Sequence, residues 1–202
     1  MKVLVAFASA LLAAAPAFGV TIVYTTSLSG PNENPPVVSP GVGVATVTVD
    51  TTAHTLRVQE TFSGLTSGTT ASHIHCCAAP PATAGVATMT PTFSGLPLGV
   101  TAGSMDQTFD TLATSTYNAP FVTANGGTAA GAEVALFAGI AAGNAYVNIH
   151  TTQNPGGEIR GFLTPAAAVP EPETYALFLA GLASLGVAAR RRQRREAERL
   201  GC

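Results

Sequence analysis

The chain places two of its four histidines and two of its three cysteines in one short segment, Ala71-Ser72-His73-Ile74-His75-Cys76-Cys77. In a β-strand successive side chains point to opposite faces, so His73, His75 and Cys77 share one face and the residues between them the other. The segment is therefore predicted to be a half-buried strand, with one apolar face and one face of nitrogen and sulfur ligands.

Two later segments, 146–151 and 157–163, show the same alternation of polar and apolar residues. Their polar faces carry an amide, an imidazole, a carboxylate and a guanidinium, which belong to Asn148, His150, Glu158 and Arg160. We expect both segments to be half-buried strands. If the fold brings the three polar faces together, the functional site lies there.

Short β-branched segments separated by Gly and Pro fill the body of the chain, residues 20–168. This pattern predicts an all-β domain. Further strands are expected at 21–28, 42–49, 55–62 and 104–112, a rigid Pro-rich loop at 29–36, and one short helix over 128–142 that ends near Gly143. The predicted fold is an antiparallel β-sandwich, Greek-key or immunoglobulin-like, with one short helix.

Glu60 is an exception within this pattern, because it falls on the apolar side of the predicted strand at 55–62. Since Glu is rarely buried without a partner, an exposed carboxylate at a frayed strand is favoured. A bulge at this point, or a role in the functional site, are the alternatives.

The first 19 residues have the layout of a secretory signal peptide. Met1-Lys2 supplies a positive start, 3–15 is almost wholly apolar, and small residues follow where cleavage would occur. The alternative is a buried N-terminal helix, but no amphipathic period accompanies the apolar run. Export is therefore predicted.

The C-terminal end has three parts in order: a Pro170-Glu171-Pro172 box, an apolar run over 175–189 and an arginine cluster that begins with Arg190, Arg191 and Arg192. The segment 169–195 resembles the PEP-CTERM sorting signal of Gram-negative bacteria that make extracellular polysaccharide. The resemblance implies recognition by an exosortase, cleavage near the box and delivery to the cell surface or matrix. A permanent tail anchor is the alternative.

The apolar run is predicted to be a membrane helix, although it is short against the roughly 20 residues that a spanning helix needs. Tilt and interfacial flanks can compensate for that length. The arginines would stay on the cytoplasmic side with a short tail, 196–202, and the domain would lie outside.

Without its two ends the chain is acidic. Only Arg57 and Arg160 remain of the nine basic residues, against seven acidic residues, a net charge of minus five. Binding to a phosphate backbone needs clustered Lys and Arg, so nucleic acid is not an expected partner. Cations and neutral surfaces such as glycans stay open.

Four separated motifs over residues 24–163 resemble the CHRD domain, named from repeats in chordin and widespread in bacterial secreted proteins. They occur in the right order, at 28–37, 71–75, 146–151 and 155–161. The resemblance implies an extracellular β domain without an established enzymatic activity. The chain departs from the family pattern at Cys76-Cys77, where many members have a turn like Gly-Pro.

A metal site is the sharpest hypothesis for the polar faces. Its predicted ligands are His73, His75 and His150, with Cys77 as a fourth, and Glu158 as a further ligand or a hydrogen-bonding partner. Imidazole binds copper and zinc well, and thiolate suits Cu(I) and zinc. The alternative is a structural network in which the histidines and Asn148 bond to loop backbone, while Glu158 and Arg160 interact across strands.

The adjacent cysteines point apart in a regular strand. In an oxidising exterior a vicinal Cys76–Cys77 disulfide that shapes the loop is favoured, with an intermolecular bond or metal ligation as alternatives. Cys202 lies beyond the predicted cleavage point.

No nucleophile elbow, phosphate-binding loop or dinucleotide fingerprint is present, so catalysis is not favoured. The predicted function is an exported binding or structural module of the cell surface or matrix, with extracellular polysaccharide or surface proteins as partners. The alternative is a secreted copper or zinc protein with a three-histidine site and redox activity.

Overall fold

The computed structural model describes residues 21–167, 179–186 and 189–193. The predicted signal peptide, 1–19, and the Pro170-Glu171-Pro172 box lie outside these residues. The chain divides into two compact units at Ala166, and each is treated separately below.

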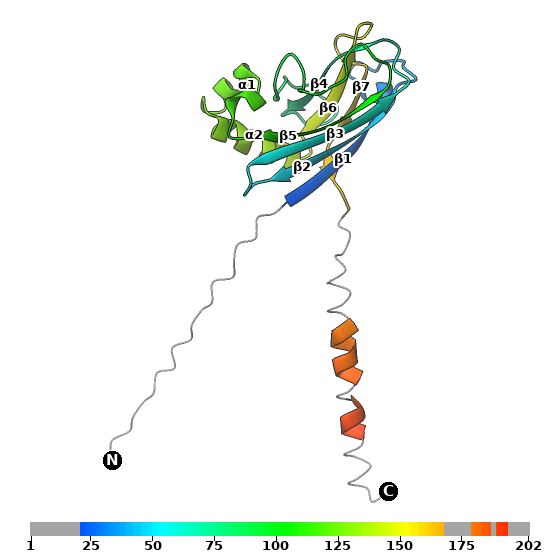
Figure 1. Cartoon of the computed structure of the whole chain (residues 1–202), viewed down its shortest axis with the longest axis vertical. Coiled ribbons are helices and arrows are strands. Elements are labelled where there is room, and N and C mark those ends of the chain that lie inside the picture. The colour runs from blue at the N-terminus through cyan, green and yellow to red at the C-terminus, as the bar shows by residue number, and fades with distance from the viewer. Residues whose placement is uncertain (1–20, 168–178, 187–188, 194–202) are drawn as a thin grey trace, which may run out of the picture. The chain divides into compact units, whose positions relative to one another are not determined.

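Eight strands form the framework of the described part of the first unit, and the seven longer ones are labelled in Figure 1. They are β1 (Thr21–Ser29), β2 (Val42–Asp50), β3 (Thr55–Ser63), β4 (Thr69–Cys76), β5 (Gly103–Asp110), β6 (Ala145–Thr151), β7 (Ile159–Phe162) and β8 (Thr164–Pro165). Each strand that the alternation predicts is present, with its ends within two residues of those expected. The short strand β8 was not predicted.

The strands form one continuous antiparallel sheet in the order β4-β6-β7-β1-β2-β3-β5, and β8 also pairs with β1. The predicted mainly-β, antiparallel character is confirmed. The predicted sandwich of two separate sheets is not found among the described residues, because β1 pairs with β2 on one side and with β7 and β8 on the other. Alternation identifies inward residues but does not say which strands pair.

The sheet curls so that its two halves face each other across a single hydrophobic core. A hydrogen bond crosses this core: Ser72 of β4 donates from Oγ to Oε1 of Glu60 on β3, at 2.8 Å. Leu56, Val58 and Ile149 are completely buried in it. One face of β4, β6 and β7 therefore belongs to the core, and their other face is covered by loops.

The expectation that Glu60 is an exposed carboxylate is wrong, since only 1 % of the residue is exposed. Burial raises the pKa of Glu60 to about 7, and the hydrogen bond from Ser72 offsets this only in part. Its Oε2 atom has no hydrogen-bond partner among the described residues. The alternation placed Glu60 correctly on the inward face.

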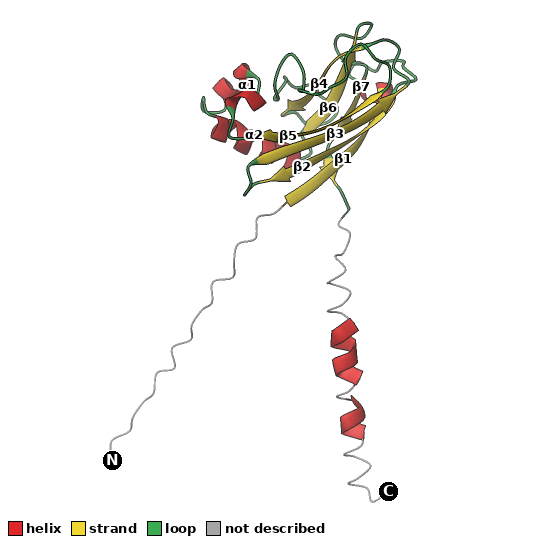
Figure 2. Ribbon diagram, viewed as in Figure 1, coloured by secondary structure: helices red, strands yellow, loops and turns green. Residues whose placement is uncertain are grey.

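Two α-helices lie together beside the sheet (Figure 2): α1 (Ala119–Ala124) and α2 (Ala129–Ala141). The helix α2 is the one that the sequence predicted. Thr128 caps its N-terminus by accepting from the Gly131 N–H, and Leu136 and Ile140, four residues apart, bury one side of it. The helix α1 corrects the expectation of a single helix.

The described part of this unit also has two short 3₁₀ helices: η1 (Gly30–Asn32) and η2 (Thr114–Thr116). The first lies in the Pro-rich segment that was predicted to be a rigid loop. Its Glu33 N–H closes the turn by donating to the Gly30 carbonyl oxygen. This turn fixes where the side chain of Glu33 enters the fold.

In the second unit, residues 179–186 and 189–193 are helical. Leu179, Leu182 and Leu185 are exposed on the first of these segments. Among the residues that the structure describes, no helix combines the length and the apolar character needed to cross a membrane.

Candidate metal centre

The register of three neighbouring strands brings the predicted site residues together. His73 of β4 lies opposite Asn148 of β6, which in turn lies opposite Arg160 of β7. His75 of β4 lies opposite Tyr146. We call this shared surface the histidine face; it carries His73, His75, Tyr146, Asn148, His150 and Arg160.

The histidine face is not half-exposed, as the alternation predicted, but mostly buried. His73 is 6 % exposed and His75 9 %, while His150 is partly exposed. Loops that run over the sheet cover these side chains and present backbone carbonyl groups to them. Periodicity in a strand cannot show that a loop covers its polar face.

Each of the three histidine rings is held by one carbonyl oxygen. The pairs are His73 Nε2 with Pro91 O at 2.8 Å, His75 Nδ1 with Ala84 O at 2.9 Å, and His150 Nδ1 with Pro155 O at 2.9 Å. A carbonyl oxygen only accepts hydrogen bonds, so each of these nitrogens carries a proton. The other nitrogen of each neutral ring then presents a lone pair.

These remaining nitrogens approach one another. His73 Nδ1 lies 3.3 Å from His150 Nε2, and Nε2 of His75 is buried without a hydrogen-bond partner among the described residues. One nitrogen from each ring lies within 4.8 Å of one from each of the others. Lone pairs that face each other repel, so the cluster favours a bound cation between the three nitrogens.

Burial also sets the protonation state of the cluster. It lowers the pKa of His73 and of His150, and lowers the pKa of His75 to about 4. The backbone hydrogen bonds oppose these shifts without reversing them. The three rings are therefore neutral at pH 7, which is the form that binds a metal ion.

Aromatic and cationic groups support one side of the cluster. The ring of Tyr146 stacks on His75 with a centroid separation of 4.8 Å, and Cζ of Arg160 lies 4.7 Å from the Tyr146 centroid. The Tyr146 hydroxyl also donates to the Ala84 carbonyl oxygen that holds His75. The orientation of His75 is thus fixed from two directions.

Arg160 is the largest of the most deeply buried side chains of the described domain, and only 1 % of it is exposed. It donates from Nε to Asn32 O at 2.5 Å and from its terminal nitrogen to Pro81 O at 2.8 Å. Its Nε lies 3.8 Å from Oε2 of Glu33. Arg160 therefore ties two covering loops to the sheet.

Glu33 is a member of this network that the sequence hypothesis did not include. Its Oε1 accepts a hydrogen bond from Nδ2 of Asn148 at 2.7 Å. Burial raises the pKa of Glu33 to about 7, against the opposing effects of Arg160 and Asn148. The only sequence signal for its role was its place in the first of the four family motifs.

Glu158 does not join the histidine face. Its carboxylate accepts from Ser39 Oγ at 2.6 Å, from Thr151 Oγ at 2.6 Å, and from the backbone N–H and hydroxyl of Thr66. Glu158 precedes the first residue of β7, next to Gly157 at a φ of 128°. Strand alternation therefore does not determine where the Glu158 side chain points. The carboxylate instead binds the loops that contain Ser39 and Thr66.

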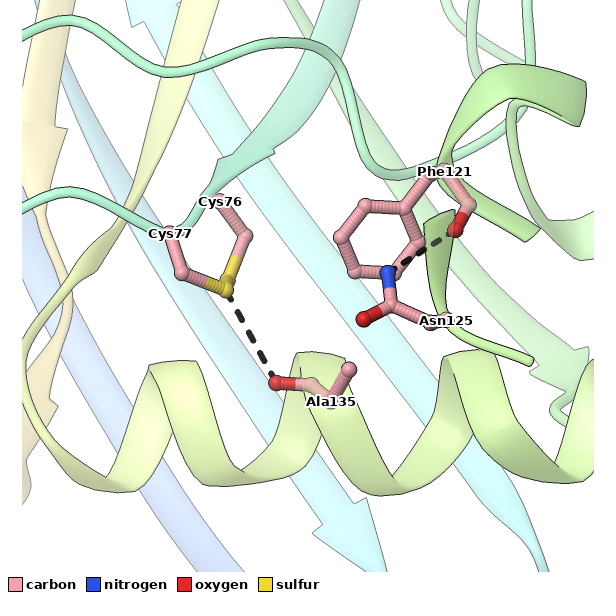
Figure 3. Close-up of a disulfide and its surroundings, with 5 residues drawn as sticks. All are labelled: Cys76, Cys77, Phe121, Asn125 and Ala135. Carbon is pink, nitrogen blue, oxygen red and sulfur yellow. Dashed lines mark hydrogen bonds between the residues drawn. A yellow bond between two sulfur atoms is a disulfide. The ribbon is translucent and has the colours of Figure 1, made fainter. Parts of the chain in front are cut away.

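Cys77 is not available as a metal ligand, because it forms a disulfide with Cys76. This disulfide is the arrangement that the sequence favoured. Figure 3 shows the two cysteines above α2, where Sγ of Cys77 lies 3.7 Å from the Ala135 carbonyl oxygen. A disulfide sulfur has no thiolate to offer a metal ion. The helix comes this close because residue 139 is Gly: a Cβ there would overlap both sulfurs.

The fourth histidine lies elsewhere, in the turn between β2 and β3. His54 Nδ1 is 3.0 Å from Oε1 of Glu133 on α2. Because His54 lies outside the cluster of His73, His75 and His150, its replacement can serve as a control for theirs.

Two family models match the chain. The PEP-CTERM protein-sorting motif matches residues 168–193, where the helical Arg190, Arg191 and Arg192 lie. This match supports export and sorting by an exosortase-type enzyme, as the sequence predicted. No match was found among curated proteins, and none among solved structures.

The CHRD domain model matches residues 24–163, which include every strand from β1 to β7 at least in part and the whole histidine face. This is more than half of the chain. The protein therefore belongs to the CHRD domain family.

Proposed function

We propose that this exported protein binds one copper or zinc ion through His73, His75 and His150. The observation that carries the proposal is the approach of three imidazole nitrogens within 4.8 Å of one another. A structural network would leave each ring satisfied, whereas here one nitrogen is buried without a partner and two others face each other.

The separation between ligand atoms supports a metal of this size. Two nitrogens bound tetrahedrally at about 2.0–2.1 Å from zinc lie about 3.3–3.4 Å apart. His73 Nδ1 and His150 Nε2 already lie 3.3 Å apart. Little movement is needed for these two atoms to share one ion.

The donor set supports copper or zinc over harder ions. Three imidazoles suit zinc and copper, while magnesium and calcium require oxygen ligands. Three protein ligands leave a fourth position for water or another small molecule, an arrangement typical of reactive metal sites. Redox activity would follow if the ion is copper.

Calorimetric titration of the exported protein with Zn²⁺ and, separately, Cu²⁺ tests this proposal. We expect binding of one ion, lost in His73→Ala and retained in the matched control His54→Ala, whose ring lies with Glu133. The proposal would be contradicted if His73→Ala still bound the ion. It would also be contradicted if His54→Ala lost binding while His73→Ala kept it.

A binding module of the cell surface or matrix is the second candidate, and one pocket favours it. The pocket, of about 520 Å³, is lined by Phe162, prolines, Glu33 and two asparagines. Rigid apolar walls with a few polar groups suit a neutral, hydroxyl-rich ligand such as polysaccharide. If so, Phe162→Ala weakens binding to neutral oligosaccharides; unchanged binding would count against this candidate.

The proposal for the whole chain places a removable signal peptide at 1–19, the domain at 20–168 and a sorting signal at 169–195. Extracellular polysaccharide or surface proteins would then be the neighbours of the sorted protein. Comparing the mass of the exported protein with that of the full chain tests cleavage near Pro170. An intact C-terminus would favour a permanent anchor.

A further inference from the structure

Asn148 lies on the histidine face beside His73 and His150. It lies directly opposite His73 on the neighbouring strand and two residues before His150 on its own strand. Both relationships place its side chain on the histidine face. The next pair along the same face is His75 and Tyr146. Asn148 is only 2 % exposed.

One atom of this buried amide is left without a partner. Nδ2 of Asn148 donates to Oε1 of Glu33 at 2.7 Å, which assigns the nitrogen end of the amide to the Glu33 side. Oδ1 then remains, and it has no hydrogen-bond partner among the described residues. A buried carbonyl oxygen without a partner is costly, so a hydrogen-bond donor is expected there.

The two unpartnered buried atoms of the histidine face are therefore both acceptors: Oδ1 of Asn148 and Nε2 of His75. The metal ion of the proposed function would satisfy the nitrogen. The oxygen needs a ligand that carries a proton. A water molecule bound to the ion provides such a proton, and metal binding makes it a stronger donor.

We propose that the fourth ligand of the metal is a water molecule or a hydroxyl group that donates a hydrogen bond to Oδ1 of Asn148. The site thereby selects protic ligands over small anions, because an anion would turn its own lone pairs toward Oδ1. Glu33 is a positioning residue that holds the amide in this orientation. This inference rests on the proposed metal site.

Azide binding to the cobalt-loaded protein tests the inference, with the visible absorption of Co²⁺ as the readout. Azide must displace the water and face Oδ1 in the unaltered protein. Asn148→Leu keeps the shape of the side chain but removes the acceptor. We expect it to bind azide about tenfold more tightly, the effect of about one hydrogen bond.

Two variants separate positioning from general damage. Glu33→Gln keeps an acceptor for Nδ2 of Asn148, so azide affinity should match that of the unaltered protein, whereas Glu33→Ala should shift toward Asn148→Leu. Asn125→Leu is the matched control, because the partly buried Asn125 likewise donates a hydrogen bond from Nδ2, in this case to the carbonyl oxygen of Phe121 on α1. It should leave azide affinity unchanged.

Asn148→Leu could fail to fold because the buried Glu33 carboxylate loses its hydrogen-bond donor. The double variant Glu33→Gln/Asn148→Leu replaces that carboxylate by an amide, and its reference is the single variant Glu33→Gln. Asn148→Leu is compared with the unaltered protein, and the double variant with Glu33→Gln. If both proteins of a pair bind cobalt and have equal azide affinity, this inference is overturned and the metal site still stands. No binding of cobalt, zinc or copper by the unaltered protein would overturn both.

Discussion

His73 and His150 lie on neighbouring strands, with Nδ1 of the first 3.3 Å from Nε2 of the second. Each ring is turned this way by a carbonyl oxygen on its far side, that of Pro91 for His73 and that of Pro155 for His150. Both carbonyls belong to loops. The loops over the sheet therefore set the direction of the lone pairs, and the strands set their spacing.

Replacement of Arg160 by Met is expected to destabilise the domain strongly. The change removes the Arg160 donor of the Asn32 carbonyl oxygen, one of the two donors of the Pro81 carbonyl oxygen, and the cation beside Glu33. Removal of one partner from a buried ionic network costs about 3–5 kcal/mol. Urea denaturation of the two proteins measures the difference.

Arg57→Met is the matched control for Arg160→Met, since Arg57 forms a bidentate ion pair with Asp106. About half of each side chain is exposed there. Water and salt screen such a pair, so stability should scarcely change. Equal losses for the two arginine variants would show that burial does not explain the role of Arg160.

Glu60→Gln is expected to remove one loss of stability that occurs as the pH rises toward 7. The pKa of Glu60 is about 7 in the folded protein, against 4.5 for an ordinary Glu. Between these values the folded state holds a proton that the unfolded chain has released, so stability falls as the pH rises from about 4.5 to about 7. Gln has no such proton to lose.

Relative to the unaltered protein, the stability at pH 7.5 minus the stability at pH 4.5 should become more positive by up to about 3 kcal/mol in Glu60→Gln. The raised pKa of Glu33 lowers stability over this range and the lowered pKa values of His73, His75 and His150 raise it, but both effects are shared by the two proteins and cancel in the comparison. Urea denaturation at the two pH values supplies the test. Parallel profiles for the two proteins would mean that Glu60 does not titrate in this range.

Gly139→Ala should test the packing of α2 on the disulfide. A methyl group at this position would overlap the sulfurs of Cys76 and Cys77, and overpacking of this kind costs about 1–3 kcal/mol. When both cysteines are replaced by Ala, the same change should instead be neutral or stabilising, because Ala is the better helix former. Thermal unfolding of the four proteins measures this coupling. Equal effects in the two backgrounds would refute the contact.

Local periodicity predicted much of this structure. Alternation located seven strands, and the spacing of His73 and His75 put both on one face with His150. It also placed Glu60 inward, where the general preference of Glu for the surface led to the wrong expectation. At that position the pattern was the better guide.

The remaining features depend on contacts between residues far apart in the chain. Glu33 meets Asn148 across 115 positions, and no local pattern links a Pro-rich loop to a strand so distant. The direction of Glu158 is set by Ser39 and Thr66, again from separate loops. Pairing of β1 with both β2 and β7, which joins the sheet into one, is equally non-local.

The metal content of the exported protein shows whether His73, His75 and His150 hold an ion. The protein is purified without a histidine tag and measured by mass spectrometry, beside His150→Ala and the control His54→Ala. We expect about one equivalent of copper or zinc in the unaltered protein and in His54→Ala, and none in His150→Ala. No bound metal in the unaltered protein, even after incubation with both ions, would contradict the proposed metal site and leave the three histidines as a structural network.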